Sequence, residues 1–222
     1  MKLIIIRHGD PDYEHDCLTE KGREEAVKLA ARLAGEKADG VYSSPLGRAR
    51  ETASYYCELT GRTAEVRDWL REFNVAVTDT ELNEQVITWD MLPAHWTKSP
   101  LLYDKDRYGE APELAGSETL SRAKAVGEGL DALLAEYGLI REGNAYRRTG
   151  SDDVTLLLFC HFGVGCVMIA HLLGIAPMVT LQGFSAEPTA VATLCTDDRF
   201  EGTVNFRLHG YGDISHLKDN KL

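Results

Sequence analysis

The chain has 222 residues, of which 44% are hydrophobic and 27% are charged, so its composition is that of a folded globular domain and not of a disordered tail. Its formal net charge of −11 disfavours a nucleic-acid partner, which needs a basic face, so we expect none. No apolar run approaches the roughly 18 residues that cross a bilayer, and the run from Met1 to Ile6 is too short for a signal-peptide core, so we expect a cytoplasmic protein with no membrane partner.

Apolar runs alternate with amphipathic stretches along most of the chain, which predicts strands alternating with helices. The first half predicts, in chain order, a strand at 2–6, a polar loop at 9–18, a helix capped by Thr19 and ended by Gly35, a strand at 40–43, a helix opened by Ser44-Pro45 that ends near Leu59, and a strand at 63–66. The second half predicts a helix at 118–137, an exposed loop at 141–153, a central strand at 154–160, a helix up to 173, and two β-like runs at 190–195 and 203–208. This order favours a three-layer α/β fold with a mostly parallel central sheet, helices on both faces and a final antiparallel edge.

The segment from Phe73 to Gly116 breaks this pattern, because its periodicity is patchy and its aromatic residues stand among three prolines. We interpret it as a partly helical excursion that acts as a lid or specificity segment within a single domain covering residues 1–222. Trp89, Trp96 and Tyr103 are expected to form the lid's own core in preference to stacking on a substrate, since aromatic side chains dominate the energy of burial.

The cysteines and histidines predict no metal site and no cofactor. The five cysteines are an odd number without a CxxC pair, which favours free thiols over a disulfide framework or a structural zinc site. The histidines outside strand ends form no HxxxH or HExxH pattern. Asp10 and Asp12 are conceivable magnesium ligands, but we interpret them as solvated acids at the entrance of a site.

Two histidines occupy matching positions at strand ends. His8 directly follows the first predicted strand, and His161 directly follows the central one. Ligand sites in open α/β sheets lie beyond the carboxyl ends of the strands, so we expect both side chains in one crevice. A single histidine is more often a surface or structural residue. The pair, each followed closely by a glycine, favours a functional site.

Arginines accompany these histidines. Arg7 precedes His8, and Arg48 and Arg50 fall in the first two turns of the predicted helix that Ser44-Pro45 opens. A cation near a helix N-terminus is unfavourable by about 0.3–1 kcal/mol, and one reason to place Arg48 there is an anion shared with the backbone N–H groups. Spacing alone leaves open whether Arg48 binds an anion or is solvated, and Arg50 is interpreted as solvated.

Four motifs, in order along the chain, resemble those of the histidine phosphatase superfamily, the phosphoglycerate mutase-like enzymes. They are Arg7-His8-Gly9, the stretch from Ser43 to Ala49 followed by Thr52-Ala53, Leu70-Arg71-Glu72, and Cys160-His161-Phe162-Gly163. The segment from Asp213 to Leu217 is similar to a common ending of the family, so the resemblance spans almost the whole chain.

This resemblance implies a metal-independent phosphomonoester hydrolase that acts through a phosphohistidine on a small phosphorylated molecule. It implies that His8 is the nucleophile, that Glu72 is the general acid and then the general base, and that Arg7, Arg48 and His161 bind the phosphoryl oxygens. Phe162 departs from the glycine common at its position and is expected to narrow the substrate pocket. The expected partner is a small phosphate ester, and a homo-oligomer is left open.

Alternative functions remain at this point. A mutase-type phosphoryl transfer and a phospho-binding pseudo-enzyme both use the same residues, although the excursion at 73–116 lacks the paired arginines with which mutases hold a second acidic group. A cysteine-dependent phosphatase is rejected, because Cys166 stands where such an enzyme needs an arginine six residues after Cys160. Gly163-Val164-Gly165 is too short a fingerprint to indicate a nucleotide-binding module.

Overall fold

The computed structural model describes residues 1–79, 82–200 and 202–218. Its strands are β1 (Lys2–Arg7), β2 (Pro11–Asp12), β3 (Cys17–Leu18), β4 (Gly40–Ser43), β5 (Glu65–Val66), β6 (Ala76–Asp79), β7 (Glu84–Ile87), β8 (Leu139–Glu142), β9 (Ala145–Arg148), β10 (Thr155–Cys160), β11 (Val191–Phe200) and β12 (Thr203–Asp213). Its α-helices are α1 (Glu20–Leu33), α2 (Gly47–Thr60), α3 (Pro93–Trp96), α4 (Thr119–Glu136), α5 (Phe162–Leu173) and α6 (Pro177–Gly183). Short 3-10 helices are η1 (Asp68–Leu70), η2 (Pro100–Tyr103), η3 (Tyr108–Glu110), η4 (Pro112–Leu114) and η5 (Ser215–Leu217).

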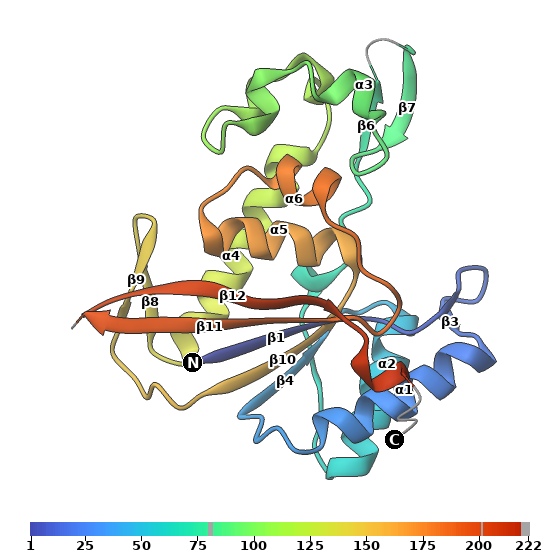
Figure 1. Ribbon diagram of the computed structural model, residues 1–222, viewed down its shortest axis with the longest axis vertical. Helices are drawn as coiled ribbons and strands as arrows, with labels where there is room; N and C mark the ends of the chain where they lie inside the picture. The colour runs from blue at the N-terminus through green and yellow to red at the C-terminus, as the bar shows by residue number, and fades with distance from the viewer. Residues whose placement is uncertain (80–81, 201, 219–222) are drawn as a thin grey trace.

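A central sheet of eight strands organises the described part of the chain, in the order β5-β4-β10-β1-β11-β12-β9-β8 (Figure 1). The strands from β5 to β1 run parallel, and those from β1 to β8 pair antiparallel. The predicted α/β fold class is therefore confirmed, with a mixed sheet that is parallel in the half that carries β1 and β10. The antiparallel partnership of the last two runs is confirmed, but their place at the edge is wrong, because β9 and β8 extend the sheet beyond β12.

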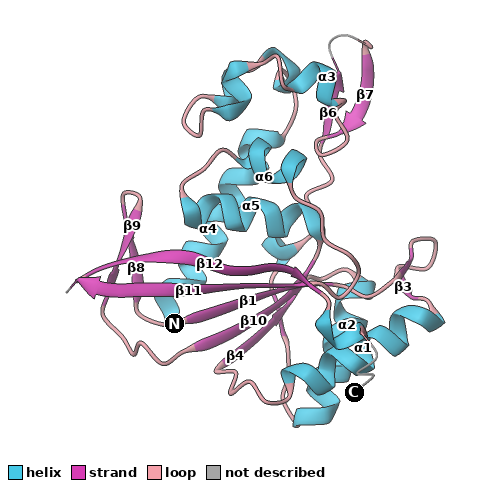
Figure 2. Ribbon diagram, in the orientation of Figure 1, coloured by secondary structure: helices cyan, strands magenta, loops and turns pink. Residues whose placement is uncertain are grey.

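Helices cover both faces of this sheet, which gives the three predicted layers (Figure 2). On one face, α1 and α2 pack over Ile4, Ile6 and Phe159. On the other face, α4 and α5 pack over the alternate residues of the same strands, such as Ile5 and Leu158. Burial on both faces explains why β1 and β10 are almost continuously apolar, since each buried aliphatic side chain contributes about 1.5–3 kcal/mol.

The predicted start of the second helix is wrong. Helix α2 begins at Gly47, so its N-cap position is Leu46, two residues after the predicted Ser44. The Ser44 hydroxyl instead accepts a hydrogen bond from the Leu46 N–H and lies beside His161, fully buried. Ser44 thus contacts His161, which is distant in the sequence, and a local capping pattern does not reveal such a contact.

The exposed loop predicted at 141–153 is also wrong for its first half. Strands β8 and β9 form a hairpin around Gly143, which has a positive φ of 63°. Tyr146 is buried and packs edge-on against Phe206, with ring centroids 5.6 Å apart. With one buried side chain among charged neighbours, the alternation of apolar and polar residues is too weak to predict a strand. Strand β9 is stabilised instead by pairing with β12.

The excursion forms a projecting lobe of the hairpin β6–β7, helix α3 and short 3-10 helices, drawn in green in Figure 1. Its aromatic residues divide between two places. The rings of Trp96 and Tyr103 stack with centroids 5.2 Å apart, although Tyr103 stays 47% exposed. Trp89 instead packs against Phe162 of α5, so it lies at the base of the lobe beside the sheet end that carries His161.

Thr19 caps α1 as predicted, since its hydroxyl accepts a hydrogen bond from the Gly22 N–H. In the described ranges, the helices lack the combination of length and apolar character that a bilayer crossing demands.

Replacing Gly22 by alanine is expected to destabilise the protein by about 1–3 kcal/mol, because an added Cβ would lie 2.2 Å from the carbonyl oxygen of Asp10 and force two backbones apart. Alanine is otherwise the better helix former by about 1 kcal/mol. Gly35→Ala is the matched control, since its Cβ would meet nothing within 4 Å. Urea unfolding measures the free energy of unfolding of each variant. Equal values for the two variants would show that the backbone at Asp10 moves to accept the added Cβ without a cost in stability.

Candidate active site

His8 lies at the carboxyl end of β1, buried, and its backbone N–H donates to the carbonyl of Cys160 at the end of β10. The Nδ1 atom is 2.7 Å from the carbonyl oxygen of Gly9, which can only accept, so Nδ1 carries the ring proton. Nε2 therefore has a lone pair, toward which the Arg48 Nε–H points from 3.2 Å. Burial, with the charges of Arg48 and Arg7, lowers the pKa of His8 to about 4 against the opposing hydrogen bond to Gly9, so the ring is neutral near pH 7.

His161 directly follows β10, and its ring centroid lies 5.1 Å from that of His8. Its Nε2 is 2.7 Å from the Ser44 hydroxyl, which accepts from the Leu46 N–H and can donate its own proton to Nε2. In that arrangement the proton of the His161 ring is on Nδ1, a buried atom without a hydrogen-bond partner in the described part of the chain. Burial and the neighbouring His8 lower the pKa of His161 to about 2, so this neutral ring offers one N–H donor to a ligand.

Arg48 lies in the first turn of α2 and is held from two sides. Its Nη1 donates to the carboxylate of Asp16 over 2.6 Å, and its Nε faces His8. Asp16 also accepts the backbone N–H of Gly47 over 2.7 Å. Burial alone would raise the pKa of Asp16, but the Gly47 N–H and the Arg48 guanidinium lower it overall, so Asp16 is a fixed negative charge that orients the arginine.

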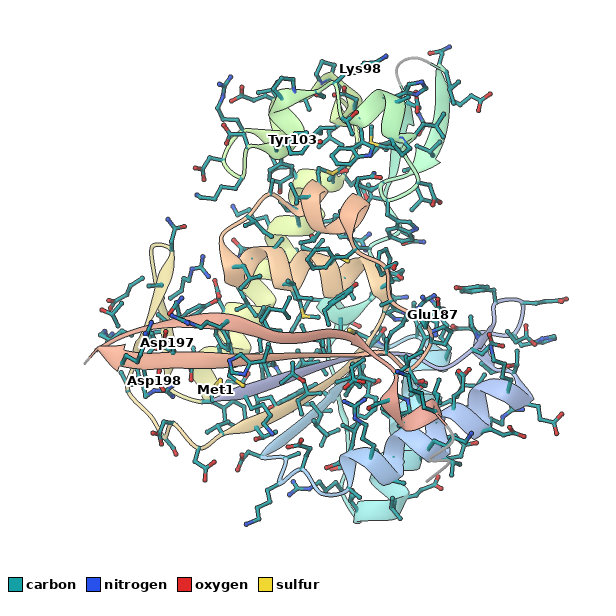
Figure 3. All side chains as sticks on the ribbon, viewed as in Figure 1. Met1, Lys98, Tyr103, Glu187, Asp197 and Asp198 are labelled. Carbon is teal, nitrogen blue, oxygen red and sulfur yellow. The ribbon has the colours of Figure 1, made fainter. Side chains whose placement is uncertain are left out.

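Arg7 ends β1 and donates from Nη1 to the carbonyl oxygen of Ala186, next to Glu187, which lies at the carboxyl end of the sheet (Figure 3). Its buried Nε has no hydrogen-bond partner among the described residues. Arg7, His161 and Phe162 line one pocket of about 290 Å³. A buried guanidinium N–H without a partner is costly unless a ligand accepts from it.

Glu72 follows η1, and its Oε1 accepts the backbone N–H groups of Phe73 over 2.7 Å and of Val164 over 3.2 Å. Burial raises the pKa of Glu72 against these two hydrogen bonds, which favours a carboxyl group that holds a proton more readily than usual. An added Cβ at Gly163 would lie 2.9 Å from Oε1 and 2.4 Å from the Trp89 ring, so glycine lets the glutamate approach the start of α5.

Phe162 is the first residue of α5, and its ring meets that of Trp89 edge-on with centroids 5.7 Å apart. The phenylalanine that replaces a family glycine therefore packs under the excursion while it also lines the pocket with Arg7. The two aromatic rings make one side of the site apolar.

The predicted residues thus meet at the carboxyl ends of β1 and β10, as their strand-end positions indicated. The sequence did not reveal Asp16, the second role of Ser44, or the approach of Trp89. Asp16 is part of a polar loop where a carboxylate is unremarkable, and only the fold brings it to Arg48.

The cysteine and the two aspartates that the sequence offered as alternative nucleophile and metal ligands have other contacts in the structure. Burial raises the pKa of the Cys160 thiol, which therefore stays protonated and unreactive. Asp12 pairs with His15 over 2.8 Å, and Asp10 contacts the Thr19 hydroxyl over 2.7 Å. Across the residues that the structure describes, no three His, Cys, Asp or Glu side chains gather as a metal site would require.

Comparison with known proteins places these residues in context. A family model described as the histidine phosphatase superfamily (branch 1) matches residues 3–206. A probable phosphoglycerate mutase GpmB of Escherichia fergusonii is 25% identical over an alignment of 152 residues, which covers 63% of this chain and 70% of the relative.

Solved structures show the same fold. A phosphoserine phosphatase variant from Entamoeba histolytica, in complex with phosphoserine, is similar over 98% of this chain and 99% of its own, with 19% identity and a TM-score of 0.63. A mycobacterial glucosyl-3-phosphoglycerate phosphatase is similar over 95% of this chain and 98% of its own, with 22% identity and a TM-score of 0.64.

Replacing Asp16 by asparagine is expected to lower kcat/KM for p-nitrophenyl phosphate by about 10-fold or more. The Gly47 N–H and the Arg48 guanidinium donate to different carboxylate oxygens, and in asparagine an NH2 group, which cannot accept, replaces one of them. Steady-state kinetics at fixed ionic strength measure the effect. Asp12→Asn, which removes the same charge from the same loop, is the control and is expected to change little. A higher kcat/KM in Asp16→Asn would mean that Asp16 competes with the phosphoryl group for Arg48.

Proposed function

Because the chain belongs to the histidine phosphatase superfamily, and is an enzyme of the phosphatase and mutase type, we propose that it hydrolyses small phosphomonoesters through a phosphohistidine at His8, without a metal. The observation that carries this proposal is the hydrogen bond from His8 Nδ1 to the Gly9 carbonyl oxygen. It places the ring proton on Nδ1 and leaves Nε2 with a lone pair, which accepts the Arg48 Nε–H in the structure and attacks phosphorus once Arg48 turns to the phosphate. The low pKa keeps that lone pair unprotonated at neutral pH.

In the first step, His8 Nε2 forms a bond to phosphorus as the bond from phosphorus to the ester oxygen breaks. The departing oxygen takes the proton of the Glu72 carboxyl group, whose raised pKa favours the protonated form in the free enzyme. Arg7, Arg48 and the His161 Nδ1–H are proposed to donate to the three other phosphoryl oxygens, where charge gathers in the transition state.

In the second step, water attacks the phosphohistidine and gives its proton to the Glu72 carboxylate. The bond from phosphorus to Nε2 breaks, its electron pair returns to His8, and inorganic phosphate leaves. Two fixed arginines and a neutral donor histidine supply the electrostatic stabilisation that other phosphatases obtain from metal ions.

The second candidate is mutase-type transfer, which the similarity to a probable phosphoglycerate mutase favours. It shares the first step but returns the phosphoryl group to a second hydroxyl. Phosphoserine and 3-phosphoglycerate are the first natural esters to compare, with release of inorganic phosphate separating hydrolysis from transfer.

Wild-type protein is expected to hydrolyse p-nitrophenyl phosphate with EDTA present, whereas His8→Ala loses at least about 10³-fold in kcat because it lacks the nucleophile. His209→Ala, which removes an exposed histidine from β12, is the matched control and keeps full activity. Rapid quenching should trap an acid-labile, alkali-stable phosphoryl group on wild type alone. Activity that EDTA removes, or that survives His8→Ala, would refute the proposed mechanism.

Replacing Glu72 by glutamine is expected to slow the first turnover of an alkyl phosphate by roughly 10²-fold or more, since an alkoxide needs a proton to leave. The first turnover of p-nitrophenyl phosphate should fall much less, because p-nitrophenolate leaves unaided. A burst of one equivalent followed by slow turnover should then appear, as the base for water is also gone. Glu58→Gln, at an exposed position of α2, is the control. Equal losses for both substrates would contradict the role of Glu72.

A further inference from the structure

A second pocket, of about 220 Å³, lies against the C-terminal half of α5. We call it the α5 pocket; Ala170, His171 and Gly174 form its wall on that helix. His171 is ten residues after His161, so the pocket lies roughly 15 Å along the helix from the active site. Its other walls come from the excursion, from α4 and from the hairpin β8–β9, which lie around α5 in Figure 1.

The lining combines positive charge with an apolar floor. Lys105, Lys124 and Arg141 reach it from three different segments. Tyr108 and Val167 are among its apolar residues. This gathering of cations is unusual in a chain of net charge −11, in which acidic side chains are in excess.

Arg141 is the central group, since it is half-buried and has no carboxylate partner in the described ranges. Its Nε donates to the Gly143 carbonyl oxygen over 2.7 Å, and its Nη1 donates to the Tyr146 hydroxyl over 2.8 Å. Its guanidinium lies 4.9 Å from the centre of the Tyr146 ring. Hydrogen bonds to the described residues use Nε and Nη1, so Nη2 keeps its donors for a ligand.

The nearest acid is occupied by other partners. Asp131 accepts a hydrogen bond from the Tyr146 hydroxyl over 2.6 Å and from His171 Nε2 over 2.9 Å. The His171 ring packs closely on α4, where a Cβ added at Gly127 would lie 2.7 Å from Nδ1. This network orders the pocket wall and fixes Arg141 through Tyr146, so the site is preorganised.

Acidic side chains pair with both lysines, and one of them, Asp106, itself lines the pocket. Lys105 pairs with Asp106 over 2.6 Å, and Lys124 lies 3.7 Å from Glu128. The carboxylates of both pairs are well exposed, and such exposed pairs contribute little. A dianion can therefore recruit both ammonium groups.

We propose that the α5 pocket binds a small organic phosphate with an apolar body. The phosphate accepts from Arg141 Nη2 and from Lys105 and Lys124, and the apolar body lies against Tyr108 and Val167. Because Lys105 belongs to the excursion, the ligand joins the excursion to α4. The site is separate from the catalytic residues and does not depend on the proposed reaction.

Phenylphosphonate tests this proposal, because its carbon–phosphorus bond resists hydrolysis. In ¹H–¹⁵N spectra of the wild-type protein, the amides of Gly143, Asn144 and Gly174 should shift saturably, and the Kd should rise with salt. Arg141→Gln is expected to weaken this Kd about 10-fold or more, and Lys124→Gln about threefold. Lys37→Gln, an exposed charge removed from another part of the surface, should leave it unchanged.

Shifts confined to amides near His8 and His161 would overturn the proposal, as would an unchanged Kd in folded Arg141→Gln. If that variant fails to fold, the double variant Lys105→Gln and Lys124→Gln tests the site instead, because both side chains carry their charge at the pocket rim. The double variant should weaken binding at least fivefold, and wild-type affinity there would refute the site. Loss of catalysis in His8→Ala leaves these shifts intact, so the two proposals fail independently.

Discussion

Parallel pairing of β1 with β10 is the constraint on which the site depends. The register joins Arg7 to Cys160, and the His8 N–H donates to the Cys160 carbonyl, so both strands end at the same level. One histidine directly follows each strand, and the rings of the two histidines lie together, with centroids 5.1 Å apart. Strands covered by helices on both faces cannot slip by one residue without exposing their apolar side chains. The stability of the core therefore holds the two rings in place.

Burial is the largest cause of the pKa shifts of His8, His161 and Glu72. It keeps His8 and His161 neutral, and it raises the pKa of Glu72. One environment thus favours an unprotonated nucleophile beside a protonated acid, which is the combination that the proposed reaction needs at neutral pH. Asp16 balances part of the positive charge and holds Arg48 by a hydrogen bond of 2.6 Å.

Helix α5 links the two pockets. Its first turn carries Phe162 and the Val164 N–H that contacts Glu72, and its last turns form a wall of the α5 pocket. The excursion touches both ends, through Trp89 above Phe162 and through Lys105 and Tyr108 at the α5 pocket. The excursion therefore packs against α5 next to the catalytic residues and also lines the α5 pocket.

Local signals in the sequence determined the strand ends, the Thr19 cap and the order of most helices and strands, because each depends on neighbours within a few positions. The roles of Arg48 and Glu72 were implied instead by the resemblance of their motifs to the histidine phosphatase superfamily. The hairpin at 139–148 escaped prediction, since its strands are stabilised by β12 rather than by their own pattern. The role of Ser44 depends on His161, 117 residues away, and the role of Asp16 on Arg48, 32 residues away. Tautomers, pKa values and the unpaired donor of Arg141 likewise arise only when folding removes water and brings distant groups together, so the tertiary structure alone decided them.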